Sequence, residues 1–180
     1  ISHAGSGQLW NDDRVRAYTG SGSNGQDIVG WMSFDLSNLS SSDVIVAATL
    51  NLHEEWGGAT NNPTMEIVES SAANWSRANV AAAGASAALS SHPRGNTVSS
   101  QFTSFSANTW NSFPLNVGQW DWSADLASGT ATLGVDNTNS AYSYVYFHGS
   151  DTAAEAPKLE LTVQTCSCAV TTTTVAVVAD

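Results

Sequence analysis

The chain has 180 residues, of which only 12% are charged, and its 16 acidic and 5 basic residues give a formal net charge of −11. Because a nucleic-acid groove needs clustered cations, this balance argues against binding to nucleic acid or to an anionic membrane. Cations, neutral glycans and other protein surfaces remain as partners. The length predicts one domain of about 150 residues with terminal extensions.

In chain order, residues 1–8 form a polar leader. Alternation of apolar and polar residues predicts short strands over residues 9–18, 28–36, 44–53, 65–69, 110–117, 130–136, 142–148 and 158–163. Residues 70–91 are rich in alanine but contain Gly84 and several serines, which favours irregular chain with at most a short helix. No apolar run reaches the roughly 20 residues that cross a bilayer, so no membrane span is expected.

The clearest signal is the stretch from Trp31 to His53, which we interpret as a strand, a turn and a second strand forming a hairpin. Its first arm places Met32, Phe34 and Leu36 on one face. Residues 37–43 are rich in Ser, Asn and Asp, which favour turns. The second arm separates two faces, one with Val44, Val46, Ala48, Leu50 and Leu52, the other with Ile45, Ala47, Thr49, Asn51 and His53.

Many short strands with turn signals between them predict an all-β fold, an antiparallel two-sheet β-sandwich of the jelly-roll type over residues 9–164. Residues 165–180 form a C-terminal β-strand extension. Because the chain starts at Ile1 and not at methionine, we expect a mature, secreted chain whose export signal has been removed, with an extracellular or cell-surface location.

The tail beyond residue 164 is apolar and β-branched, without charge, proline or glycine over residues 169–179. We expect it to lack a partner strand in its own domain and to insert into a neighbouring copy. The alternatives are a further strand of the same sheet or a linker. The expected subunit-joining residues are Val170, Thr172, Thr174, Val175, Ala176, Val177 and Val178.

The only cysteines, Cys166 and Cys168, lie in the same tail. Three interpretations stay open for them. One is a strained internal disulfide, the second is a pair of bridges to a neighbouring chain, and the third is a two-cysteine metal site that lacks completing ligands nearby.

Several segments together resemble the DNRLRE-type domain, a secreted jelly-roll module related to carbohydrate-binding modules. They include RVRAY, WMSFDLSNL, VIVAATLNLH, WNSFPLNVGQWDWSADL and YFHGSDTAAEAPKLELTV, in that order, and span about residues 12–164. The matching positions are Phe34, Asp35, Leu36, Ser37, Ala48, Thr49, Leu50, Leu52, Phe147, Ser150, Pro157, Leu159 and Val163. The resemblance implies an extracellular jelly roll and, in some members, glycan binding.

No catalytic residues are expected. His148, Ser150 and Asp151 contain the residue types of a hydrolase, but no nucleophile elbow surrounds the serine. The four histidines are scattered without ligand spacing, so no metal centre or other cofactor is expected. Calcium is the one alternative, bound by the acidic pairs Asp12 with Asp13 or Glu54 with Glu55, although no loop shows a calcium-ligand series.

Aromatic faces stack on sugar rings, so four of the seven tryptophans are candidates for glycan contact: Trp31, Trp56, Trp120 and Trp122. Each of the four is also explained by burial in the sandwich core or in a subunit interface. Asn38 and Asn74 begin sequons for N-glycosylation. The sequence favours an extracellular structural protein, the subunit of a homopolymeric filament or surface layer joined by strand exchange. The alternative is a carbohydrate-binding module of a secreted protein.

Overall fold

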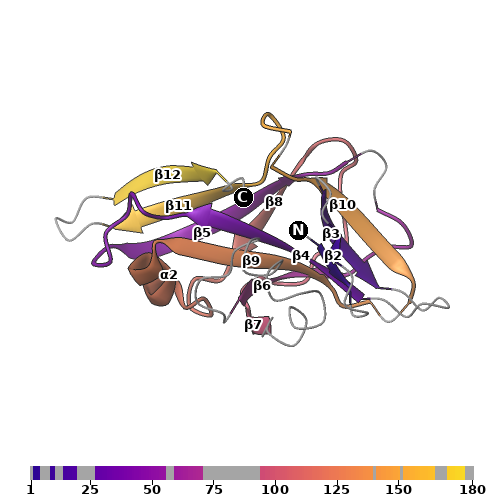
Figure 1. The fold of residues 1–180 in the computed structure, drawn as a ribbon, viewed down its shortest axis with the longest axis horizontal. Helices are drawn as coiled ribbons and strands as arrows, with labels where there is room; N and C mark the ends of the chain where they lie inside the picture. The colour runs from indigo at the N-terminus through magenta and orange to yellow at the C-terminus, as the bar shows by residue number, and fades with distance from the viewer. Residues whose placement is uncertain are drawn as a thin grey trace.

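The computed structural model describes residues 2–4, 9–10, 14–19, 27–55, 59–70, 94–139, 141–150, 152–164 and 170–176. These residues form two antiparallel sheets that pack against each other (Figure 1). The predicted all-β sandwich is therefore confirmed. The alanine-rich residues 71–93 and the leader residues 1 and 5–8 lie outside the described part.

The larger sheet has the order β10-β3-β4-β9-β6-β7, with β1 added against β4 and β2 against β1. The smaller sheet has the order β12-β11-β5-β8. The bounds are β1 Ser2–Ala4, β2 Leu9–Trp10, β3 Arg14–Thr19, β4 Asp27–Asp35, β5 Val44–His53, β6 Met65–Ser70, β7 Arg94–Thr97, β8 Trp110–Leu115, β9 Thr130–Asn137, β10 Ser143–His148, β11 Lys158–Gln164 and β12 Val170–Ala176. The helix α2 spans Trp122–Ser128 and packs beside β9.

The core lies between the inner faces of the two sheets. Side chains from both sheets are fully buried there, among them Phe34, Leu50, Leu133, Phe147 and Leu161. Each such side chain contributes roughly 1.5–3 kcal/mol by leaving water. A core of this kind explains why alternation could be read from the sequence, since every second residue of a strand faces it.

The predicted hairpin from Trp31 to His53 is wrong in its pairing, although both strands and the turn are present. β4 pairs with β9 in the larger sheet, and β5 pairs with β8 and β11 in the smaller sheet. Residues 36–43 therefore cross from one sheet to the other. In a hairpin the apolar faces of the two arms would lie side by side, whereas this crossing turns them toward each other across the core.

The predicted face assignment of β5 is wrong at its start. Ile45 is buried while Val44 and Val46 are exposed, and from Ala48 to Leu52 the even-numbered residues are the buried ones. The register against β11 shifts between Thr162 and Val163 at this point. A β-bulge of this kind inserts one residue and reverses the phase of alternation, which an unbroken period of two cannot represent.

The C-terminal strand β12 pairs with β11 along its whole length, from Gln164 opposite Val170 to Lys158 opposite Ala176. The expectation that the tail has no partner in its own domain is therefore wrong. It forms the edge of the smaller sheet, and the yellow β12 runs along β11 in Figure 1. Val170 is 62% exposed, so the start of the strand carries an apolar side chain in contact with solvent.

In the parts of the chain that the structure describes, no helix has the length and apolar character needed to cross a membrane.

Candidate functional site

The two sheets meet along one edge, where the chain leaving β5 runs beside β10. Glu54 forms a bridge to Phe147, and the backbone N–H of Glu55 donates to the carbonyl of Tyr146 at 3.0 Å. Farther along, the N–H of Thr60 donates to the carbonyl of Tyr144 at 2.9 Å. We call this junction the seam. It brings side chains from the outer faces of both sheets close together.

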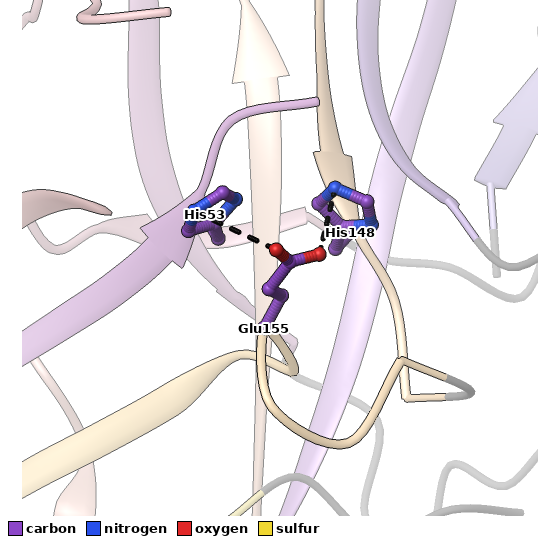
Figure 2. A group of neighbouring side chains, drawn as sticks. All are labelled: His53, His148 and Glu155. Carbon is purple, nitrogen blue, oxygen red and sulfur yellow. Dashed lines mark ion pairs between the residues drawn. The ribbon is translucent and has the colours of Figure 1, made fainter. Parts of the chain in front are cut away.

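Three donors converge at the seam. His53 ends β5, His148 ends β10, and Glu155 lies in the connection between β10 and β11. One ligand atom from each of them lies within 4.8 Å of the other two. Figure 2 shows the two imidazoles on either side of the Glu155 carboxylate. We call this group the histidine cluster.

Within the histidine cluster, Nε2 of His148 lies 3.1 Å from Oε2 of Glu155, and Nε2 of His53 lies 3.9 Å from Oε1. His53 is only 8% exposed, and its Nδ1 has no hydrogen-bond partner among the described residues. Its ring contacts Trp110 edge to face at 5.3 Å between centroids, and Nζ of Lys158 lies 4.1 Å from the centre of the same indole. The Trp110 ring thus contacts both the imidazole of His53 and the ammonium group of Lys158.

A second group of side chains continues from the histidine cluster over the outer face of the larger sheet. Alternate residues of β10 point outward, and Tyr144, Tyr146 and His148 follow one another on this face. Their cross-strand neighbours on β3 are Tyr18, Arg16 and Arg14 in the same order. With Tyr142, which precedes β10, all four tyrosines of the chain gather here. We call these four tyrosines with Arg14 and Arg16 the tyrosine face.

The rings of the tyrosine face form a stacked row. Tyr144 lies 4.8 Å from Tyr146 and 6.2 Å from Tyr18 between ring centroids, with interplanar angles of 21° and 19°. Stacked neighbours cover one another's ring faces, so the row presents mainly ring edges and hydroxyls. Tyr142 differs, because its ring stands almost perpendicular to Tyr18 and to Tyr144 and is 40% exposed.

The arginines support the row from β3. The guanidinium carbon of Arg16 lies 5.3 Å from the centre of the Tyr146 ring, and that of Arg14 lies 5.9 Å from it. Arg14 also donates from Nη2 to Oε1 of Glu55 at 2.8 Å. Gly30 lets β3 approach closely, since a Cβ there would lie 2.7 Å from the backbone nitrogen of Arg16. Burial raises the pKa of both Tyr18 and Tyr146 above 10.0, so their hydroxyls stay protonated at neutral pH.

Two of the tryptophans expected to contact glycans are buried instead. Trp31 is 4% exposed because its ring covers Gly134, the residue opposite it on β9, which has no side chain of its own. Trp120 is 4% exposed, and its Nε1 donates to Oδ2 of Asp125 at 2.7 Å. Trp122 is half-buried against the core, and Trp56 lies outside the described residues. The prediction of glycan contact is therefore wrong for Trp31 and Trp120.

The carboxylates named for calcium have other contacts. Oε2 of Glu54 accepts the backbone N–H of Asn108 at 2.7 Å, and this side chain is 1% exposed. Glu55 pairs with Arg14, so the two acids do not form a common cation site. Asp12 and Asp13 lie outside the described residues.

The remaining predicted sites are mostly beyond the described chain. Asn38 is exposed in the turn between β4 and β5, while Asn74 lies in the undescribed residues 71–93. Cys166 and Cys168 lie in the undescribed residues 165–169, and Val177 and Val178 lie in the undescribed residues 177–180. Asp151 is also outside, and His148 belongs to the histidine cluster at the seam.

Sequence reasoning missed both groups for different reasons. The tyrosine face was readable, because RVRAY and YSYVYFH each alternate and place their arginines and tyrosines on one side. The histidine cluster was not, because His53 and His148 are brought together only by the pairing at the seam. Comparison with models of known protein families gives no match, and comparison with curated proteins gives none either.

Proposed function

We propose that the chain is an extracellular carbohydrate-binding module that contacts a neutral glycan through the tyrosine face. The observation that carries this proposal is the gathering of all four tyrosines with two arginines on one outer sheet face. Phenol hydroxyls and the exposed guanidinium of Arg14 supply hydrogen-bond donors, and ring edges and faces supply apolar contact. Sugars present the same two kinds of surface, hydroxyl groups and patches of C–H.

Charge favours a neutral ligand over an acidic one. The net charge of −11 repels polyanions, and the cations of the tyrosine face already contact Tyr146 and Glu55. The resemblance to DNRLRE-type domains points to the same class of ligand and to secretion. The low content of charged residues fits a secreted β-rich protein.

The test is binding of the purified chain to a panel of neutral and acidic polysaccharides, measured by calorimetry or affinity electrophoresis. Tyr142→Ala and Tyr144→Ala should each weaken binding to a neutral polysaccharide by about tenfold, since an aromatic contact is worth roughly 0.5–1.5 kcal/mol beyond its burial. Val46→Ala is the matched control, because Val46 is an exposed apolar residue of the smaller sheet. Unchanged affinity in both tyrosine variants, or no binding to any member of the panel, would refute the proposal.

Self-assembly into a homopolymer is the second candidate, and the edge position of β12 favours it. A strand whose one pairing partner among the described strands is β11 can be replaced by residues 170–176 of a second copy with the same register. The exchange requires residues 165–169, which contain Cys166 and Cys168, to cross between copies.

Microscopy of the full chain and of a chain truncated after residue 169 tests the exchange. Filaments of the full chain that disappear on truncation support it. A monomeric full chain, or polymers that survive the truncation unchanged, would contradict it.

A further inference from the structure

We propose that the histidine cluster binds a divalent transition-metal ion, with zinc as the reference metal, through His53, His148 and Glu155. This inference is independent of the glycan proposal. It starts from the convergence of three electron-pair donors, two imidazoles and a carboxylate, within 4.8 Å. A neutral imidazole can donate its Nε2–H to the carboxylate, and in its other tautomer it offers the Nε2 lone pair to a metal ion that lies among the three groups.

The spacing suits a metal ion after a small closure. Zinc binds imidazole nitrogen at about 2.0–2.1 Å and carboxylate oxygen at about 2.0–2.2 Å, which places tetrahedral donors roughly 3.0–3.5 Å apart. Nε2 of His148 lies 3.1 Å from Oε2 of Glu155, which meets this spacing, while Nε2 of His53 lies 3.9 Å from the other carboxylate oxygen, Oε1. The three ligand atoms lie within 4.8 Å of one another, so the cluster must contract to hold an ion. Glu155 lies in a turn with 34% of its side chain exposed, so it is the ligand that can move.

The donor set and its surroundings select the kind of metal. Two imidazoles with one carboxylate suit zinc and similar ions, whereas calcium and magnesium prefer oxygen donors throughout. The exposed side of Glu155 leaves room for water as a fourth ligand. His53 is more than nine-tenths buried, and its Nδ1 has no hydrogen-bond partner among the described residues. Packing against neighbours such as Trp110 therefore holds the ring in place.

The position of the histidine cluster between the two sheets means that a bound ion would stabilise the fold. His53 comes from the smaller sheet, His148 from the larger sheet, and Glu155 from the connection between them. A metal bound to all three therefore ties the two sheets together at the seam. Because the unfolded chain lacks this arrangement, metal binding stabilises the folded state by mass action.

The test adds zinc to the metal-free full chain and follows both thermal unfolding and binding by calorimetry. Zinc at about 100 times its dissociation constant should raise Tm by about 5–10 °C, and calcium should not. Glu155→Gln and His148→Gln should each lower zinc affinity by roughly tenfold or more. Glu160→Gln is the matched control, because Glu160 is an exposed acid of β11 outside the cluster.

Cobalt substitution separates this site from the cysteines. The cobalt-loaded chain should show visible d–d absorption without a thiolate charge-transfer band, and the Cys166→Ser/Cys168→Ser variant should keep full zinc affinity. Absence of any response to zinc, in both Tm and calorimetric heat, would overturn the proposal. Equal zinc affinity in Glu155→Gln, or loss of binding in the double cysteine variant, would overturn it as well.

Discussion

Asp125 predicts an unusual dependence of stability on pH. Its carboxylate lies beside Trp120, whose Nε1 donates to Oδ2 at 2.7 Å, and near Glu69, whose Oε2 accepts the backbone N–H of Asp121. Burial raises the pKa of Asp125 to about 7, the hydrogen bond from Trp120 opposes this shift, and the charges of Glu69 and Asp121 add to it. The side chain is therefore largely protonated in the folded state below neutral pH.

The sign and size follow from linkage. An acid whose folded-state pKa exceeds its unfolded value stabilises the fold fully below the unfolded pKa, and that contribution is lost as the pH rises through the folded pKa. With an ordinary value of 3.8 and a folded value of about 7, the free energy of unfolding should fall by about 2.5 kcal/mol between about pH 5 and pH 8. For a domain of this size the loss corresponds to a decrease in Tm of about 5–10 °C.

Thermal or urea unfolding of the wild type and of Asp125→Asn across this range measures the effect. The asparagine keeps an acceptor for Trp120 but cannot ionise, so the decrease attributed to Asp125 should disappear in the variant. Asp35→Asn is the control, because hydrogen bonds from Ser37 lower the pKa of the exposed Asp35 and move its titration below the tested range. If the wild type and Asp125→Asn lose stability equally from pH 5 to pH 8, the reasoning fails.

Two further predictions concern the larger sheet. Gly134→Ala should lower the free energy of unfolding by about 1–3 kcal/mol, because the new Cβ would lie 2.7 Å from the buried ring of Trp31. Urea unfolding followed by tryptophan fluorescence measures this loss, and an unchanged unfolding midpoint would contradict the prediction. Asn137→Ala should lower the free energy of unfolding by about 1–3 kcal/mol and loosen Tyr142, because the buried Asn137 amide donates to the carbonyl and hydroxyl of Ser143. Both the Tm and the glycan affinity should decrease, and a variant in which neither decreases would refute this role of Asn137.

Much of the fold could be predicted from single strands considered alone. The bounds of β5 agree with the predicted residues 44–53, and β9 differs from its prediction by one residue, because apolar alternation against a common core is a local property of the chain. The bulge near Val46 and the crossing at residues 36–43 could not be predicted in this way. Both depend on which strands pair, and alternation carries no information about pairing.

In the candidate site too, features that depend on alternation within one strand could be predicted from the sequence, and features that depend on strand pairing could not. The outward direction of Tyr144, Tyr146 and His148 follows from alternation within one strand, so the tyrosine face was accessible to sequence reasoning. The burial of Trp31 was not, because it depends on the glycine that the register places opposite it on β9. Similarly, His53 meets His148 only because the chain after β5 joins the edge of β10.

The tyrosine face and the histidine cluster share β10, yet the two proposals can fail separately. Tyr142 and Tyr144 contact other tyrosines, while Glu155 contacts the two histidines, so variants of one group leave the contacts of the other intact. Loss of zinc affinity in Glu155→Gln with unchanged glycan affinity would assign the metal to the seam alone. His148 follows Tyr146 by two residues on the same face of β10. If Glu155→Gln also reduced glycan affinity, the metal would be ordering the end of the strand that presents the tyrosines.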